Sequence, residues 1–77
     1  MSENANVVEI TAANFETDVL ERSFQVPVVL DFWAEWCGPC KTLGPLLDAE
    51  VEKRGGAFVL AKLDTEKNPE LAGAFQI

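Results

Sequence analysis

The chain has 77 residues, 48% of them hydrophobic, and a formal net charge of −7 from 13 acidic and 6 basic side chains. Such a length accommodates one small domain at most, and the hydrophobic content excludes an intrinsically disordered chain. The acidic balance, without any basic cluster, disfavours nucleic acid and anionic membranes as partners.

The first residues give no sign of export or membrane insertion. Residues 1–6 are polar and read as a loose lead-in, without the basic and apolar regions of a secretory signal. The longest apolar stretch, which begins near Val26, is too short to span a bilayer. We therefore expect a cytoplasmic protein, in which a close cysteine pair is more often catalytic or redox-sensing than structural.

The predicted elements begin with a short strand over residues 7–10 and a helix over residues 12–23. Thr11 offers a hydroxyl that can cap this helix. The apolar stripe of the helix would consist of Phe15, Val19 and Leu20.

A second strand and a second helix follow. Residues 26–34 are almost continuously apolar, which is typical of a strand covered on both faces, and Pro27 suits its start. The helix over residues 37–54 contains Pro45, which predicts a kink. The helix face toward the sheet would consist of Leu43, Leu46, Leu47 and Val51.

The last predicted elements are a strand over residues 58–63 and a helix over residues 69–75, with Asn68 as its cap and Pro69 in its first position. Three strands alternate with three helices, so we expect an α/β fold with parallel strands and right-handed crossovers. The turn after the second strand would then lie at the C-terminal end of a central strand, where ligands bind in open α/β sheets.

The most informative segment is Trp-Cys-Gly-Pro-Cys-Lys at residues 36–41, directly after the second predicted strand. Cys37 and Cys40 are three positions apart and so lie on one side of a helical turn. At the start of a helix, unpaired N–H groups and the positive end of the dipole favour a thiolate, the nucleophile of disulfide exchange. The pattern predicts a dithiol that cycles between reduced and oxidised states.

Three other uses of the pair stay open from the residues alone. A zinc site needs four ligands, so two cysteines without any histidine can complete a Cys/His site only if two chains share it. A structural disulfide over so short a loop would stabilise the fold weakly. Both residues could also be inert core thiols. The position between a strand and a helix favours redox catalysis over all three.

Residues 31–41, Asp-Phe-Trp-Ala-Glu-Trp-Cys-Gly-Pro-Cys-Lys, resemble the active-site segment of the thioredoxin family, and the similarity extends over nearly the whole chain. It implies a thioredoxin-like fold with three layers, α/β/α, as a single partial domain over residues 1–77. The chain would hold the N-terminal βαβαβα portion of that fold and lack the C-terminal ββα part. Residues 58–64 and 71–75 also resemble the thioredoxin domain of bacterial co-chaperones that carry tetratricopeptide repeats.

The resemblance also implies roles for the residues of the cysteine turn. Cys37 would be the nucleophile that attacks a substrate disulfide, and Cys40, one turn deeper, would be the resolving thiol. The substrate-binding surface would consist of Trp36, Gly38 and Pro39, where glycine allows close approach and proline presets the helical φ.

Asp31 is a lone carboxylate inside an apolar strand, so burial should raise its pKa and make it a proton acceptor for Cys40. The alternative is that Asp31 faces solvent at a strand edge or caps a neighbouring turn. Lys62, on the next strand, would pair with Asp31 and temper the shift, unless it extends to the surface. Trp33 would support the active turn from the core.

The function expected from the resemblance is the reduction of protein disulfides through the dithiol, in cell redox homeostasis. Its partners would be protein disulfide substrates and an external thioredoxin reductase that supplies electrons, with no metal and no bound cofactor. The alternatives are a chaperone module that binds clients and an inactive half-domain. Without further strands, Val59 and Leu63 would lie on an exposed sheet edge, which predicts that the isolated chain folds poorly, self-associates or pairs with another chain.

Overall fold

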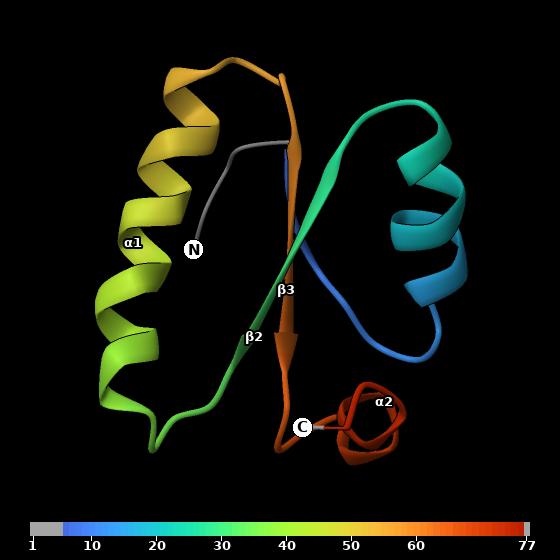
Figure 1. Cartoon of the computed structure of the whole chain (residues 1–77), viewed down its shortest axis with the longest axis vertical. Helices are drawn as coiled ribbons and strands as arrows, with labels where there is room; N and C mark the ends of the chain where they lie inside the picture. Colours follow the sequence, from blue (N-terminus) through green and yellow to red (C-terminus); the bar gives the residue numbers. More distant parts are fainter. Residues whose placement is uncertain (1–5, 77) are drawn as a thin grey trace.

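The computed structural model describes residues 6–76, which form a three-stranded parallel sheet with helices on both faces (Figure 1). In chain order the elements are β1 (Val7–Glu9), η1 (Glu16–Glu21), η2 (Arg22–Phe24), β2 (Val28–Trp33), α1 (Gly38–Lys53), β3 (Val59–Asp64) and α2 (Pro69–Ala74). α1 covers one face of the sheet, and η1 and α2 lie on the other side (Figure 1). This arrangement confirms the predicted α/β fold, a portion of a thioredoxin-like fold.

The predicted lead-in lies outside the described residues except for Asn6, whose carbonyl accepts a hydrogen bond from the Leu60 N–H at 2.8 Å. The chain is therefore already attached to the sheet at Asn6.

The sheet order is β1-β3-β2, so β3 and not β2 is the central strand. The crossover from β1 to β2 leaves a gap that β3 later fills, and β3 pairs in parallel with both neighbours. Val59 and Leu63 on β3 are consequently buried, so the prediction that they lie on an exposed edge is wrong. Val29 on β2 is exposed, so β2 is not covered on both faces as expected. Any pairing through a sheet edge of the described residues would involve β1 or β2, and self-association itself stays a prediction.

The first helical segment begins with a reciprocal cap, as Thr11 predicts. The Thr11 hydroxyl accepts a hydrogen bond from the Ala13 N–H at 3.2 Å, and the Asn14 side chain accepts one from the Thr11 N–H at 2.7 Å. This exchange satisfies two backbone donors that the first helical turn leaves unpaired. The segment then continues as the π-helical η1 and the 3₁₀-helical η2 instead of the predicted regular helix.

The apolar core on the η1 side of the sheet consists of Ile10, Val19, Ala61 and Leu63, with Val8, Phe15, Val28, Leu30, Phe32 and Leu71 packed against it. Phe15 and Val19 thus face the sheet as predicted, whereas Leu20 is exposed. The Phe75 ring meets Phe15 and Phe32 edge to face, with ring centroids 5.8 and 5.2 Å apart. These contacts connect the end of α2 to the sheet.

α1 begins at Gly38 and ends at Lys53, close to the predicted bounds, with Cys37 as its N-cap. Val51 is buried as predicted, but Leu43 and Leu46 are 48% and 60% exposed. The face toward the sheet follows the spacing of Cys40, Gly44, Asp48 and Val51 instead. Cys40 lies on this face, with its Sγ 3.9 Å from the Phe32 carbonyl oxygen on β2. α1 is continuous through Pro45, and the kink there stays a prediction.

α2 begins at Pro69, as predicted, but Asn68 does not cap it through its side-chain oxygen. The Asn68 amide donates instead to the carbonyls of Asp64, at 3.0 Å, and Ile10, at 3.4 Å. Asp64 itself is buried and accepts from the N–H groups of Glu66 and Lys67 at 2.9 and 3.2 Å. These bonds fix the turn that follows β3, near the cysteines.

Candidate active site

The cysteine turn follows directly from the sheet. β2 ends at Trp33, the chain turns over Ala34 to Trp36, and α1 begins at Gly38. The Cys37 N–H donates to the Ala34 carbonyl at 3.0 Å, which closes this turn. The cysteines therefore lie where a parallel strand ends and a helix begins, as the sequence predicts, although that strand is at the edge of the sheet.

Cys37 and Cys40 form a disulfide, with their Cα atoms 5.3 Å apart. This separation is within the usual range for disulfides, so one helical turn brings the sulfurs together without unwinding. The two cysteines are the only ones in the chain, so the structure represents the oxidised state of the predicted dithiol.

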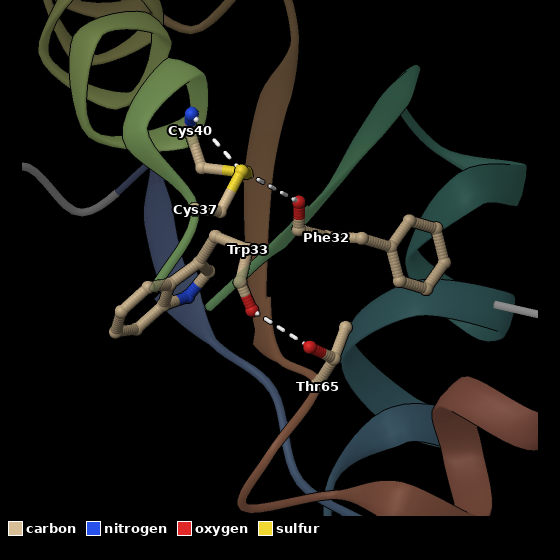
Figure 2. Close-up of a disulfide and its surroundings, with 5 residues drawn as sticks. All are labelled: Phe32, Trp33, Cys37, Cys40 and Thr65. Carbon is tan, nitrogen blue, oxygen red and sulfur yellow. Dashed lines mark hydrogen bonds between the residues drawn. A yellow bond between two sulfur atoms is a disulfide. The ribbon is translucent and has the colours of Figure 1, made fainter. Parts of the chain in front are cut away.

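The sulfur of Cys37 is the one that the helix start favours as a thiolate. Its Sγ accepts a hydrogen bond from the Cys40 N–H at 3.3 Å (Figure 2). Pro39, between them, has no N–H, so the Cys40 amide is the first donor of α1 that can reach this sulfur. An amide donor and the positive end of a 16-residue helix both stabilise negative charge there.

Cys40 lies deeper and faces the sheet. Its Sγ is 3.9 Å from the carbonyl oxygen of Phe32 on β2 (Figure 2). In the disulfide this sulfur carries no proton, so the approach is a contact; a reduced Cys40 thiol would have an acceptor in this direction. The two sulfurs therefore differ in environment, one facing an amide donor and the other a carbonyl acceptor.

Asp31 shares a cavity with Cys40. This inner cavity, of about 240 Å³, lies between β2, β3 and α1 and is lined by Asp31, Trp33, Cys40, Lys41, Gly44, Pro45 and Lys62. Asp31 is only 8% exposed, so it does not face bulk solvent. Burial raises the pKa of its carboxyl above the usual range, and the charge of Asp48 adds to this, while the ammonium of Lys62 lowers it. The cavity can admit water between the carboxyl and the sulfur.

The direct ionic partner of Lys62 is Asp48 rather than Asp31. Lys62 and Asp31 are neighbours in the register of β3 and β2, but the Lys62 ammonium lies 2.9 Å from the Asp48 carboxylate on α1. The expected effect of Lys62 on Asp31 is thus present as a longer-range attraction that lowers the pKa of Asp31. Sequence reasoning missed Asp48, although its position eight residues after Cys40 places it on the same helix face.

The outer surface beside the disulfide is apolar and open. Trp36 is 75% exposed, and Gly38 and Pro39 are also exposed, as a substrate-binding role requires. A shallow outer groove of about 120 Å³ runs next to them, lined by Phe32, Trp33, Ala34, Trp36, Cys37, Cys40 and Thr65. These positions fit the predicted substrate-binding surface, whose use stays a prediction.

Thr65 is a residue of this groove that the sequence did not point to. Its hydroxyl and its N–H both donate to the Trp33 carbonyl, at 3.1 and 2.9 Å (Figure 2). These bonds join the turn after β3 to the end of β2. Trp33 is half-buried between the inner cavity and the outer groove, which agrees with its predicted supporting position.

Within residues 6–76, no group of three or more His, Cys, Asp or Glu side chains is arranged to hold a metal ion. In the same part of the chain, no helix has the length and hydropathy needed to cross a membrane.

The similarity of this chain to known proteins extends over almost its whole sequence. A family model described as thioredoxin matches residues 6–77. The chain is 46% identical over 76 residues to the thioredoxin of Mycobacterium tuberculosis, covering 99% of this chain and 64% of that protein. It is 44% identical over 71 residues to the thioredoxin of Listeria monocytogenes, covering 92% of this chain and 65% of that protein.

A third relative is named bifunctional thioredoxin reductase/thioredoxin, from Mycobacterium leprae. It is 46% identical over 77 residues, covering 99% of this chain and 16% of that protein. The chain thus spans 64% of the length of the mycobacterial thioredoxin. The family match extends over residues 6–77, which include the cysteine turn, and the chain belongs to the thioredoxin family.

Proposed function

We propose that this chain is a thiol–disulfide oxidoreductase that reduces disulfides in other proteins through Cys37 and Cys40. The observation that carries the proposal is the disulfide at the start of α1, in which the Cys40 N–H donates to the Cys37 sulfur. A reversible bond held against a helix N-terminus is the arrangement that disulfide exchange needs. Membership of the thioredoxin family supports it.

The first step uses Cys37 as the nucleophile. In the reduced protein, the Cys37 thiolate attacks one sulfur of a substrate disulfide, and a new bond forms between them as the substrate bond breaks. The departing substrate sulfur leaves as a thiolate and takes a proton from solvent. The Cys40 amide that now donates to Cys37 would stabilise the attacking thiolate.

The second step uses Cys40 as the resolving thiol and Asp31 as its proton acceptor. The Cys40 thiol gives its proton to the Asp31 carboxylate through the inner cavity that both residues line. The resulting thiolate attacks the Cys37 sulfur of the mixed disulfide. The Cys37–substrate bond breaks as the Cys37–Cys40 bond forms, and the second substrate sulfur leaves as a thiolate that takes a proton from solvent. A raised pKa suits Asp31 for this role, because a carboxylate of ordinary pKa accepts a proton poorly near neutral pH.

The substrate would lie across Trp36, Gly38 and Pro39, which are exposed next to the disulfide. The Trp36 ring supplies apolar contact area, and Gly38 has nothing within 4 Å of the position that a Cβ would occupy. A substrate backbone can therefore approach the sulfur of Cys37 closely.

Each turnover oxidises the dithiol by two electrons, so a reductant must restore it. We assign this role to an external thioredoxin reductase, in the cytoplasm, where thiols are kept reduced. The name of the Mycobacterium leprae relative joins a thioredoxin reductase and a thioredoxin in one protein, which supports the pairing. No cofactor within this chain is needed, because the cysteines themselves carry the electrons.

The test is insulin reduction with thioredoxin reductase and NADPH. We expect turnover by the parent chain and a loss of roughly a thousandfold or more in Cys37→Ser, since the nucleophile is removed. Cys40→Ser should instead accumulate a mixed disulfide with insulin that dithiothreitol releases. The absence of turnover in the reduced, folded parent chain would overturn the proposal. Suppression of insulin aggregation that survives Cys37→Ser would favour client binding of the chaperone type, which the matched relatives do not favour.

A further inference from the structure

Lys62, which lines the inner cavity, belongs to an ionic pair that the exchange of disulfides does not by itself require. Asp48 on α1 and Lys62 on β3 are 2.9 Å apart, and their side chains are only 35% and 26% exposed. Asp31 lies beside Lys62 in the register of β2 and β3. Asp31 and Lys62 therefore both line the cavity next to Cys40, and Asp48 is bound to Lys62 from α1.

We propose that Asp48 is a positioning residue that holds the Lys62 ammonium against α1, away from Asp31, so that Asp31 stays a usable proton acceptor for Cys40. This inference rests on the proposed function, because it assigns Asp48 a part in the second step of the exchange. Asp48 touches neither the substrate nor the sulfurs in this arrangement and acts only through its neighbours.

The alternation of side chains in the sheet leads to this arrangement. Residues paired in register point to the same face, so Asp31 and Lys62 both face α1. An ammonium on a long flexible stem next to a buried carboxylate would pair with it directly if nothing else attracted it. Asp48, on the helix above, offers a competing carboxylate within hydrogen-bond distance.

The remaining charged group around the cavity does not compete for this role. Lys41 lines the cavity, but its ammonium lies 3.7 Å from Glu35, and both of these side chains are mostly exposed, at 59% and 75%. Cys40 is the other titratable group at the cavity wall and is the proton donor of the step. The charges that act on Asp31 from the adjoining elements are therefore Lys62 from β3 and Asp48 from α1.

Asp48 affects Asp31 in two ways with the same sign. Its negative charge raises the pKa of Asp31 directly, and its pairing with Lys62 limits how far the ammonium can lower that pKa. Without Asp48, Lys62 is free to turn toward Asp31 and to stabilise its carboxylate. Asp31 would then ionise more readily and accept the proton of Cys40 less well.

The test is the titration of the Asp31 carboxyl, followed by its carboxyl-carbon NMR signal in the oxidised protein. We expect Asp48→Asn to move the titration midpoint to lower pH than in the parent chain. The amide keeps the size of the side chain and an acceptor for Lys62 but removes the charge. The matched control is Glu50→Gln on the same helix, which loses an exposed pair with Arg54 at 2.8 Å and should leave the midpoint unchanged.

The kinetic measurement is the pH dependence of the release of substrate from the mixed disulfide. On the acid side, the rate of release rises with pH as Asp31 ionises; this rise is the acid limb of the profile. In Asp48→Asn the acid limb should move to lower pH, and the release rate at pH values above it should fall by a factor of about two to five. Asp48→Glu, which keeps the charge, should restore most of the parent profile. A loss of helix packing alone would lower the rate at all pH values without moving the limb.

An unchanged Asp31 midpoint in folded Asp48→Asn would overturn the inference, and Asp48→Ser serves in its place if that variant does not fold. The titration is made on the oxidised protein and needs no turnover. If the proposed function is wrong, the parent chain will not reduce insulin, whatever the titration midpoints of Asp31 in the parent chain and the variants. The two failures are therefore distinguishable.

Discussion

The two faces of the sheet differ in what their side chains do. On the side toward η1 and α2, the side chains that pack together are apolar, and the buried ones are Ile10, Ala61 and Leu63 together with Val19 of η1. On the face toward α1, the neighbouring positions include Asp31 and Lys62 and border a cavity of about 240 Å³. One face is closed by packing, and the other keeps charged groups next to a space that water can enter.

The two faces differ because successive side chains along β2 point to opposite sides of the sheet. Val28, Leu30 and Phe32 of β2 pack on the closed face, whereas Asp31 and Trp33 alternate with them and face the cavity. A slip of one residue in the pairing with β3 would exchange the two sets. The six residues of β2 therefore serve both purposes: those on one face pack in the core, and those on the other face line the cavity.

The largest effect on stability should come from the closed face. Leu63→Ala on the central strand removes a side chain with no exposure, leaves a cavity between sheet and helices, and should cost about 2–5 kcal/mol of unfolding free energy. Urea denaturation measures this loss.

The matched control is Leu46→Ala on α1, where the leucine is 60% exposed and the cost should stay within about 0.5 kcal/mol. Similar losses in the two variants would show that the closed face is not where the fold gains its stability.

A substitution on the face toward α1 should instead raise the free energy of unfolding. Asp31 is buried and its pKa is raised, so a charged Asp31 carboxylate costs the folded chain more free energy than it costs the unfolded chain. Asp31→Asn removes that charge and should raise the free energy of unfolding at neutral pH, on the order of 1–3 kcal/mol. A neutral Asp31 stabilises the parent chain fully below its ordinary pKa of 3.8, and this contribution is lost as the pH rises through the raised, folded value. The advantage of Asp31→Asn should therefore shrink toward about pH 4, as urea denaturation at the two pH values would measure.

The same variant should lose activity while it gains stability. Removal of the proton acceptor should slow the release of substrate from the mixed disulfide by about a hundredfold near neutral pH. Stopped-flow fluorescence of Trp36 and Trp33 can follow that step. Glu21→Gln, at an exposed carboxylate on η1, is the control and should change neither property. A stability gain that is constant across pH would contradict the assignment of a raised pKa to Asp31.

The sequence predicted the order of elements and the cysteine turn because those features depend on local patterns. The spacing of Cys37 and Cys40, the apolar run before them and Pro69 at a helix start are all signals within a few residues. The raised pKa of Asp31 was also predictable, since a carboxylate within an apolar strand has few alternatives to burial.

The mistakes arose where a distant part of the chain decides the outcome. β3 lies between β1 and β2, which no local pattern of β2 reveals, so the edge and central strands were interchanged. α1 turns Cys40 and Asp48 toward β2 and β3, a tertiary contact that the leucine pattern does not reveal, and that pattern alone therefore assigned Leu43 and Leu46 to the wrong face. The pairing of Asp48 with Lys62 spans fourteen positions and two elements and so was also missed.

A smaller loss of stability is expected when the cap of the helical segment that covers the closed face is removed. Thr11 accepts from the Ala13 N–H at 3.2 Å and begins the segment that places Phe15 and Val19 on the sheet. Thr11→Ala leaves that donor without its partner and should lower the free energy of unfolding by about 1 kcal/mol. Thr42→Ala, at an exposed position inside α1, removes the same atoms from a helix interior, where alanine is the better helix former, and should cost nothing. Urea denaturation of both variants measures the difference, and amide hydrogen exchange should show the added loss concentrated in η1. If the two variants lose stability equally, the cap does not help to hold η1 on the closed face, and packing of Phe15 and Val19 alone keeps it there.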